Sequence, residues 1–262
     1  MITNTNIDHG KAFDWGRASE DYAKFRDIYP DVFYHKIIDA GLCGPDQTVL
    51  DLGTGTGVLP RHLYAHGARF VGADISENQI AWARKLSKEA GMDIEYVVAS
   101  AEDVEFPAGS FDVVLACQCF MYFNLDIVIP KIHALLKPGG HVCILSMIWL
   151  PLESDIAQAS ENLVLKYNPH WTGAGFRRSV PTVPGWANGL FEAANLDAFD
   201  LPISFTRESW HGRMIACRGI GASSLSEAEI AAFEREHQVY LSSVPEPFEI
   251  PHIAYMVDLA KV

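Results

Sequence analysis

The residues with the clearest chemical potential are a carboxylate, a run of glycines and a second carboxylate further along the chain. Asp51 lies inside the apolar run VLDL, and Gly53, Gly55 and Gly57 follow it in the pattern D-x-G-x-G-x-G. Glycine lacks Cβ, so the backbone at these positions can turn sharply and approach a ligand closely. Asp74 closes the next apolar run, where a carboxylate can accept hydrogen bonds from both hydroxyls of a ribose. The pattern predicts a site for an adenosine-containing ligand.

Two kinds of ligand fit a glycine loop that follows a strand. A dinucleotide site has the pattern G-x-G-x-x-G, and Val58 stands here at the third glycine position. A pyrophosphate would gain nothing from the carboxylate of Asp51, whereas a ligand with an α-ammonium group and a sulfonium would. We therefore favour such a ligand and keep a nicotinamide-dependent oxidoreductase as the alternative. No Y-x-x-x-K motif supports that alternative after the fifth predicted strand, since Trp171 follows Tyr167 at that spacing.

These residues require a parallel sheet to position them, because predicted strands and helices alternate between residues 48 and 148. The predicted strands cover 49–53, 69–73, 94–99, 111–117 and 141–148. Helices are predicted over 56–66, 76–89 and 126–136, with Ser76 as a helix N-cap. This alternation indicates βαβ units, and ligands of such sheets bind beyond the carboxyl ends of the strands.

Beyond residue 149 the pattern is less regular. Helices are predicted over 152–167, 185–195, 207–217 and 226–241, a loop over 168–185, and strands over 198–205 and 249–259. The stretch between about 206 and 245 therefore reads as a helical insertion, which we expect over the strand ends.

The charge and the cysteine content of the chain limit its possible binding partners and its cellular compartment. The chain has 20 Lys and Arg against 33 Asp and Glu, a formal net charge of -13, which argues against nucleic acid as the main partner. The start of the chain, residues 1–11, is polar, and we expect it to be frayed. We predict neither a signal peptide nor a membrane span, and no metal site. Five scattered cysteines favour free, buried thiols, so we expect a cytoplasmic protein.

Four segments carry a family resemblance. VLDLGTGTG, ADIS at 73–76, SAEDVEFPAGSFDVV at 100–114 and LLKPGG at 135–140 resemble the successive motifs of class I S-adenosylmethionine (SAM) dependent methyltransferases with a methyltransferase type 11 domain. The resemblance implies an α/β, Rossmann-like sheet of seven strands. That sheet is mostly parallel with its last strand antiparallel, has helices on both faces, and carries an inserted helical substrate cap. The product would be S-adenosylhomocysteine (SAH).

The resemblance also implies roles around the cofactor. Asp51, with the loop glycines, would hold the methionine end, Asp74 the ribose and Ile75 the adenine, while Gln118 would lie near the transferred methyl group. The expected cofactor-binding residues are Tyr22, Arg26, Asp51, Gly53, Thr54, Gly55, Asp74, Ile75, Gln79, Ala101, Glu102 and Gln118.

The flanks resemble a narrower group, the trans-aconitate-methyltransferase-like proteins. YAKFRDIYP, at 22–30, is similar to their N-terminal Y-x-x-x-R-x-x-Y-P, which would place Tyr22 and Arg26 on the cofactor, with Arg26 near its carboxylate. The segment 206–237 is similar to their C-terminal substrate helices. One departure is Met121-Tyr122-Phe123, where that group has His-Trp-Phe. This change lies at the expected mouth of the substrate pocket, so the substrate need not be that of the group.

The division of the chain follows from these predictions. We expect an N-terminal helical segment over the cofactor site (1–44), a SAM-binding core (45–148), its continuation with a cap loop (149–205), a helical substrate cap (206–245) and a last core strand (246–262). The predicted function is in-line methyl transfer to a small-molecule acceptor, with a carboxylic acid as one candidate. A non-catalytic SAM-binding module is a further alternative.

The residues for the acceptor come from segments expected to face the strand ends. They are Met121, Tyr122, Trp149, Trp171, Arg177, Trp210 and Arg213. Packing explains Trp149 and Trp210 equally well, and Arg177 with Arg178 is more simply a solvated pair. A carboxylate acceptor needs no general base, whereas a hydroxyl or protonated amine does. We assign no catalytic residue and keep Tyr122 and His211 as candidates.

Overall fold

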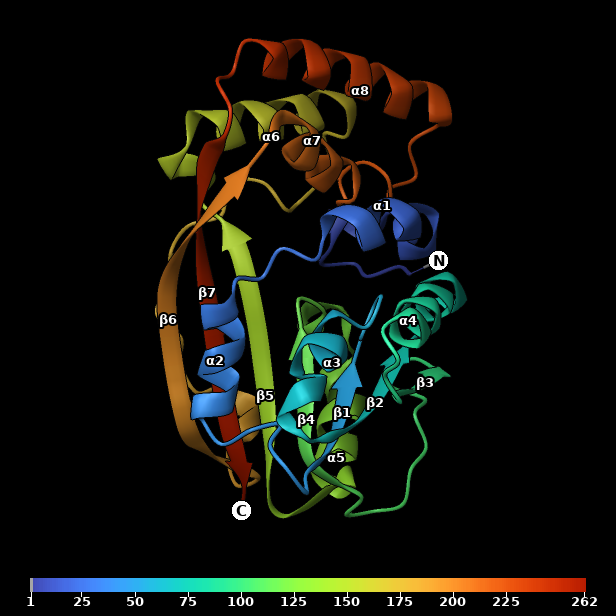
Figure 1. Cartoon of the computed structure of the whole chain (residues 1–262), viewed down its shortest axis with the longest axis vertical. Helices are drawn as coiled ribbons and strands as arrows, with labels where there is room; N and C mark the ends of the chain where they lie inside the picture. The colour runs from blue at the N-terminus through green and yellow to red at the C-terminus, as the bar shows by residue number, and fades with distance from the viewer. Residues whose placement is uncertain (1) are drawn as a thin grey trace. The chain divides into compact units, whose positions relative to one another are not determined.

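A computed structural model describes residues 2–262; Met1, part of the predicted segment 1–44, lies outside them. Seven strands form one sheet in the order β3-β2-β1-β4-β5-β7-β6 (Figure 1). The strands are β1 Thr48–Leu52, β2 Arg69–Asp74, β3 Glu95–Val98, β4 Phe111–Cys117, β5 Leu136–Trp149, β6 Phe191–Phe205 and β7 Phe248–Lys261. β1 to β5 pair in parallel, and β7 runs opposite to β5. The predicted sheet is confirmed.

The helices follow the strands in the expected order. They are α1 Ser19–Phe25, α2 Asp31–Asp39, α3 Val58–Leu63, α4 Glu77–Glu89, α5 Leu125–Leu135, α6 Asp155–Tyr167, α7 Arg207–Ile215 and α8 Glu227–Ser242. Ser76 caps α4 by accepting a hydrogen bond from the Gln79 amide, as predicted. Ser226 and Glu229 form a reciprocal capping box at α8, which fixes where that helix begins.

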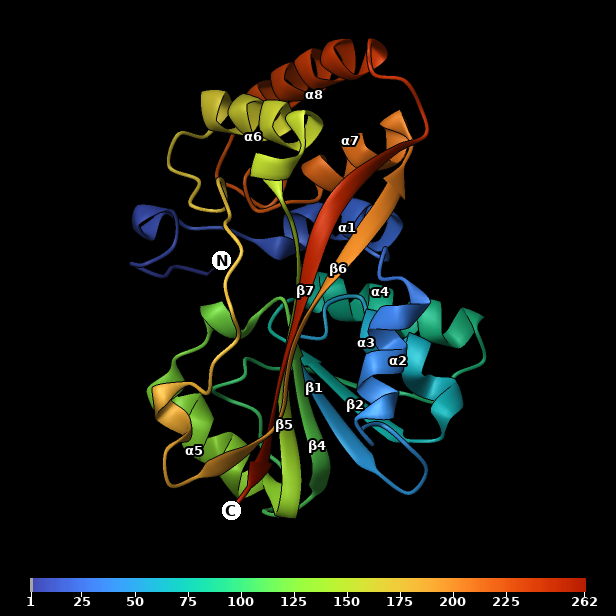
Figure 2. The ribbon, with the colours of Figure 1, turned by 90° about the vertical axis from the view of Figure 1, so that its left-hand side faces the viewer.

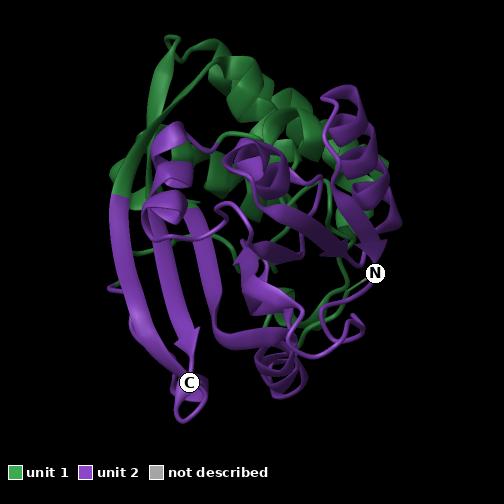
Figure 3. Cartoon of the chain, turned by 60° about the horizontal axis from the view of Figure 1, so that its bottom comes forward, with its two compact units in different colours: residues 1–28, 148–179, 200–253 green, residues 29–147, 180–199, 254–262 purple. Residues whose placement is uncertain are grey.

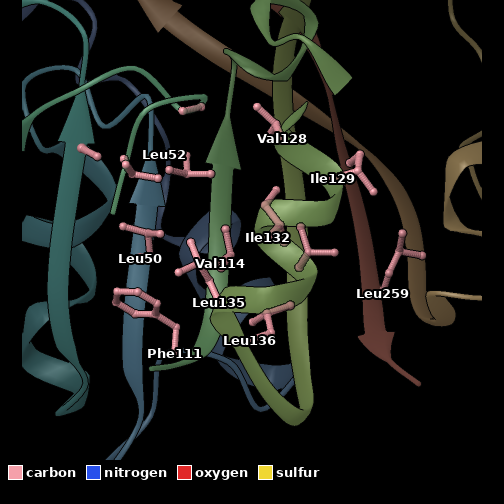
Figure 4. Packing of buried hydrophobic residues seen from close by; sticks show 14 of the residues in the cluster. Leu50, Leu52, Phe111, Val114, Val128, Ile129, Ile132, Leu135, Leu136 and Leu259 are labelled. Atoms are coloured by element: carbon pink, nitrogen blue, oxygen red, sulfur yellow. The ribbon is translucent and has the colours of Figure 1, made fainter. Parts of the chain in front are cut away.

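A hydrophobic core holds the parallel strands in place (Figure 4). Leu50, Val114 and Leu136 from β1, β4 and β5 are fully buried in it. On α5, Val128, Ile132 and Leu135 recur at helical spacing and pack into the same cluster. This core positions the carboxyl ends of β1 and β4, where the predicted ligand residues lie.

The chain divides into two compact units (Figure 3). Unit 1 comprises 1–28, 148–179 and 200–253, and unit 2 comprises 29–147, 180–199 and 254–262. Unit 2 therefore contains β1 to β4 and α2 to α5, whereas unit 1 contains α1 and α6 to α8. The long strands β5, β7 and β6 lie next to one another in the sheet (Figure 2), and each has residues in both units.

The predicted helix over 185–195 is wrong. Only a 3-10 turn, Gly185–Ala187, forms there, and β6 begins at Phe191. The segment FEAANL has good helix formers, but tertiary pairing overrides such a weak preference. Phe191 is buried, and the Val262 amide, directly after β7, donates a hydrogen bond of 3.1 Å to the Leu190 carbonyl, directly before β6.

The N-terminal residues are also not frayed as predicted. Ile2 pairs with Phe13 through two backbone hydrogen bonds of 2.8 and 3.0 Å. Asp8 is only 5% exposed, accepts a hydrogen bond of 2.8 Å from the Thr172 amide, and forms an ion pair with Arg218. Long-range partners, which a local pattern does not reveal, therefore fix this segment within unit 1.

Two isoleucines on α5 provide a test of the core. Ile132 is 1% exposed and Ile127 is 47% exposed. We expect Ile132→Ala to lower the free energy of unfolding of the full chain by about 2–5 kcal/mol, because it leaves a cavity among the strands. Ile127→Ala should change it by less than about 0.5 kcal/mol. Urea denaturation measures both, and equal losses would contradict this account of the core.

Candidate functional site

The glycine loop, residues 53–57, leaves β1 through left-handed backbone conformations. Gly53, Gly55 and Gly57 have φ of 66°, 56° and 74°. A Cβ on Gly53 would lie 2.7 Å from the Cys119 sulfur, and one on Gly57 would lie 2.3 Å from the Tyr96 hydroxyl oxygen. Only glycine meets both requirements, a permissive φ and no side chain, at these two positions.

Hydrogen bonds tie this loop to the end of β2. The Thr54 amide donates to the Ala73 carbonyl at 2.9 Å, and the Gly55 amide donates to Asp74 Oδ2 at 3.0 Å. The Ser76 amide donates to the other oxygen of Asp74 at 2.8 Å. A carboxylate has about four lone-pair positions, so Asp74 keeps two for hydroxyl donors of a ligand. The amides of Thr54 and Gly55, by contrast, are already used in hydrogen bonds within the protein.

Asp51 is a buried carboxyl group at the same end of the sheet. It is 2% exposed, and burial raises its pKa to about 7, although the nearby Thr54 hydroxyl lowers it and the negative charge of Asp74 raises it further. Burial likewise raises the pKa of Asp74, against the two amide hydrogen bonds. Two carboxylates that resist ionisation favour a positively charged ligand beside them.

The residues expected around the adenine lie on the loops after β2 and β3. Ile75 follows Asp74 directly and is 52% exposed, so its apolar side chain is open to a ligand beside Asp74. Ala101 is buried, and the Glu102 carboxylate accepts a hydrogen bond of 2.7 Å from the Asn124 amide. Gln79, in contrast, is buried in the first turn of α4.

The segment after β4 has a strained residue at its start. Gln118 has a φ of 62°, which is uncommon outside glycine. Its amide donates to the Leu145 carbonyl at 2.9 Å, and its side-chain Nε2 donates to the Met147 carbonyl. The side chain predicted near the methyl group is thus fastened to β5. Met121 is 54% exposed, and Tyr122 closes a 3-10 turn.

This arrangement can hold S-adenosylmethionine. A carboxylate with free lone pairs, an exposed apolar side chain next to it and a buried acid that favours a cation match the ribose, the adenine and the charged end of that molecule. At the ends of the neighbouring strands β1, β2 and β3, unit 2 brings together Asp51, Gly53, Thr54, Gly55, Asp74, Ile75, Ala101 and Glu102. Their individual roles on the cofactor stay predictions.

Tyr22 and Arg26 lie in unit 1, on α1 and directly after it. The Arg26 guanidinium carbon lies 4.8 Å from the centre of the Tyr22 ring and 5.8 Å from that of Trp15. Tyr22 and Arg26, both predicted to bind the cofactor, thus contact each other. Cation–π contact of this kind orients a guanidinium.

Four of the predicted acceptor residues form one buried group in unit 1, which we call the tryptophan cluster: Trp149, Trp171, Trp210 and Arg213. The Trp149 ring lies 5.8 Å from Trp210, edge to face, and 6.5 Å from Trp171. The Arg213 guanidinium lies 4.8 Å over the Trp149 ring and is 3% exposed. A cation–π contact thus holds this guanidinium over the Trp149 ring.

Arg177, Arg178 and His211 are not members of the tryptophan cluster. Arg177 is exposed, and Arg178 binds both oxygens of Glu153, at 2.6 and 2.8 Å, and also Asp200. His211 Nδ1 lies 2.9 Å from His237 Nδ1, and burial lowers the pKa of His211. Arg178 is therefore committed to a surface ion-pair network.

Two buried polar residues near the tryptophan cluster were missed in the sequence. Glu161 accepts hydrogen bonds from Trp149 Nε1 at 2.6 Å and from the Gly175 amide at 2.8 Å. It shares the buried stripe Ala157, Ser160, Glu161 and Val164 of α6, and that helical spacing was its only signal. His252 lies on β7 on the same face as Ile250 and Ala254, and all three side chains are fully buried.

Within residues 2–262, no three His, Cys, Asp or Glu side chains are grouped as a metal site would need. Nor does the described part of the chain contain a helix with the length and apolar character that crossing a bilayer requires.

Comparison with known proteins identifies the family. A methyltransferase domain model matches residues 50–144. The ubiquinone biosynthesis O-methyltransferase of Pseudomonas paraeruginosa is 30% identical over 178 residues, which cover 64% of this chain and 75% of that protein. The demethylmenaquinone methyltransferase of Thermus thermophilus is 33% identical over 175 residues, covering 64% and 74%.

A solved structure shows the same fold. The YcgJ protein of Bacillus subtilis matches with a TM-score of 0.55 and 18% identity, over 88% of this chain and 99% of that one. The family removes the nicotinamide-dependent oxidoreductase that was kept above as an alternative. The chain belongs to the class I S-adenosylmethionine-dependent methyltransferases, enzymes that take their methyl group from that cofactor.

Proposed function

We propose that this enzyme methylates a small molecule that carries a carboxylate group, and that Arg213 holds this carboxylate. The single observation that carries the acceptor proposal is the burial of Arg213, which is 3% exposed over the ring of Trp149. Charge-assisted hydrogen bonds from a guanidinium to a carboxylate are strong and directional. The two relatives are named for quinones, which are small molecules and agree with this size class.

For the cofactor, we propose that Asp51 balances the α-ammonium group, Asp74 binds the ribose hydroxyls and Ile75 covers the adenine. The bound sulfonium supplies a methyl group that is already activated for in-line displacement. The protein must then hold the acceptor close to that group and exclude water. The support lies in the raised pKa of Asp51, in the two lone pairs left on Asp74 and in the exposure of Ile75.

The function can be tested by turnover. We expect SAH to form when the full chain is incubated with SAM and a panel of small carboxylic acids, each supplied with and without a hydroxyl group. Arg213→Gln should raise KM for the acid at least about tenfold, because one ionic hydrogen bond is worth about 1.5–3 kcal/mol. The dissociation constant for SAH should not change.

Arg235→Gln is the matched control, since Arg235 is an exposed arginine on α8. No SAH with any acid, or the same KM for both variants, would contradict the acceptor proposal.

Cofactor affinity should depend on pH through Asp51. Its pKa of about 7 means that the group must lose its proton to pair with the α-ammonium of SAH. Calorimetry should therefore show affinity that weakens about tenfold from pH 8 to pH 6, as expected for one coupled proton. Asp51→Asn should abolish this dependence and weaken binding at pH 8. Asp93→Asn, which changes an exposed carboxylate, should leave both the pH dependence and the affinity at pH 8 unchanged. A wild-type affinity that does not depend on pH would refute the role of Asp51.

The same carboxyl group should lower stability in the absence of the cofactor. Its folded pKa of about 7 lies above the ordinary value of 3.8, so the folded state binds more protons than the unfolded state between these pH values. The free energy of unfolding should then fall as pH rises from about 4 to 7. At pH 8 we expect Asp51→Asn to be more stable than the wild type by on the order of 1–3 kcal/mol. Thermal unfolding at pH 5 and pH 8 tests this, and a destabilised variant at pH 8 would disprove it.

A further inference from the structure

His252 has a fixed hydrogen-bonding state. The residue is fully buried on β7, and its Nδ1 lies 2.8 Å from the Ile250 carbonyl oxygen. A carbonyl oxygen only accepts hydrogen bonds, so Nδ1 must carry the hydrogen. In the neutral ring the other nitrogen, Nε2, then presents a lone pair. Burial, together with the positive charge of Arg213, lowers the pKa of His252 to about 4, although the bond to Ile250 opposes this, and the ring is neutral at pH 7.

The lone pair on Nε2 has no donor in the described chain. Among residues 2–262, no group forms a hydrogen bond with this buried atom. Leaving a buried polar atom unsatisfied costs about 1–3 kcal/mol, and such atoms are rare in native proteins. A donor that is not part of the protein would remove this cost.

The atom belongs to the surroundings of the tryptophan cluster. His252 stacks on Phe205 at 6.0 Å, and Phe205 lies 5.0 Å from Trp210, a member of the cluster. On the neighbouring strand, the Leu150 amide donates to the Pro251 carbonyl at 2.8 Å, which brings the residue after Trp149 beside the residue before His252. Arg213 is close enough to act on the charge of His252. All of these residues lie in unit 1.

We infer that His252 Nε2 accepts a hydrogen bond from a hydroxyl group of the methyl acceptor. The acceptor is then a hydroxylated carboxylic acid, with its carboxylate on Arg213 and a hydroxyl on His252. The donor is uncharged, because an ammonium group would be repelled by the buried guanidinium. A carboxylate alone has no hydrogen to offer. This inference rests on the proposed function and adds the second recognition element of the same acceptor.

The test uses matched pairs of acids, for example 4-hydroxybenzoate with benzoate and citrate with tricarballylate. SAH formation by the full chain gives kcat/KM for each acid. We expect hydroxylated members to be preferred about 10- to 100-fold, the range of one hydrogen bond to a buried partner. No preference in any pair would overturn the inference while leaving the proposed function intact. No SAH from any acid would overturn both.

Two variants separate recognition from packing. In His252→Asn the amide NH2 can keep the bond to Ile250 while the Nε2 lone pair is lost, and in His252→Gln an amide oxygen can take its place. We expect the Asn variant to lose the preference for hydroxylated acids through KM, and the Gln variant to recover part of it. Both should keep the melting temperature and the SAH affinity of the wild type. An Asn variant that keeps the preference would refute the role of His252, and so would a Gln variant that shows none.

Discussion

At the carboxyl end of β1 the backbone passes through space that a side chain would fill. Gly53 faces the Cys119 sulfur and Gly57 faces the Tyr96 hydroxyl, while the amides between them bond to Ala73 and Asp74. These partners come from β2, from β3 and from the segment after β4. The loop therefore takes this course only when four parallel strands are in register, and the buried leucines and valines of the core enforce that register. The chemistry at the strand ends depends on this steric constraint.

The same region accumulates negative charge. Asp51 and Asp74 are both buried at the strand ends, and burial makes the ionisation of each carboxyl group unfavourable. A protein that needed only stability would place apolar or hydrogen-bonded neutral groups there. We propose that the cationic cofactor brings the compensating positive charge. Ionising these two carboxyl groups is unfavourable in the free enzyme. A bound cation relieves this cost, and the relief adds to the affinity for a cationic ligand.

The glycine loop, Asp74, Ser76 and the order of strands and helices up to residue 149 could be predicted because each leaves a local mark, a pattern of glycines, a cap or a periodicity. The strand at Phe191 could not, since its pairing with β7 comes from distant residues. Asp8 looked like part of a solvated tail, and only Arg218 and Thr172 explain its burial. Glu161 and His252 were missed because a single polar residue on an apolar face gives no sign of what it meets there.

Unit 1 is assembled from three separate stretches of chain, and this has a consequence for synthesis on the ribosome. Residues 29–147 of unit 2 emerge as one continuous stretch, and their strands can condense as they appear. The first 28 residues emerge earlier still, but Arg218, the ion-pair partner of Asp8, is made 210 residues later. At translation rates of about 5–20 residues per second, that is a wait of roughly 10 to 40 s. Asp8 therefore waits for its ion-pair partner long after its own synthesis, and during this interval the segment around it is open to chaperones and proteases.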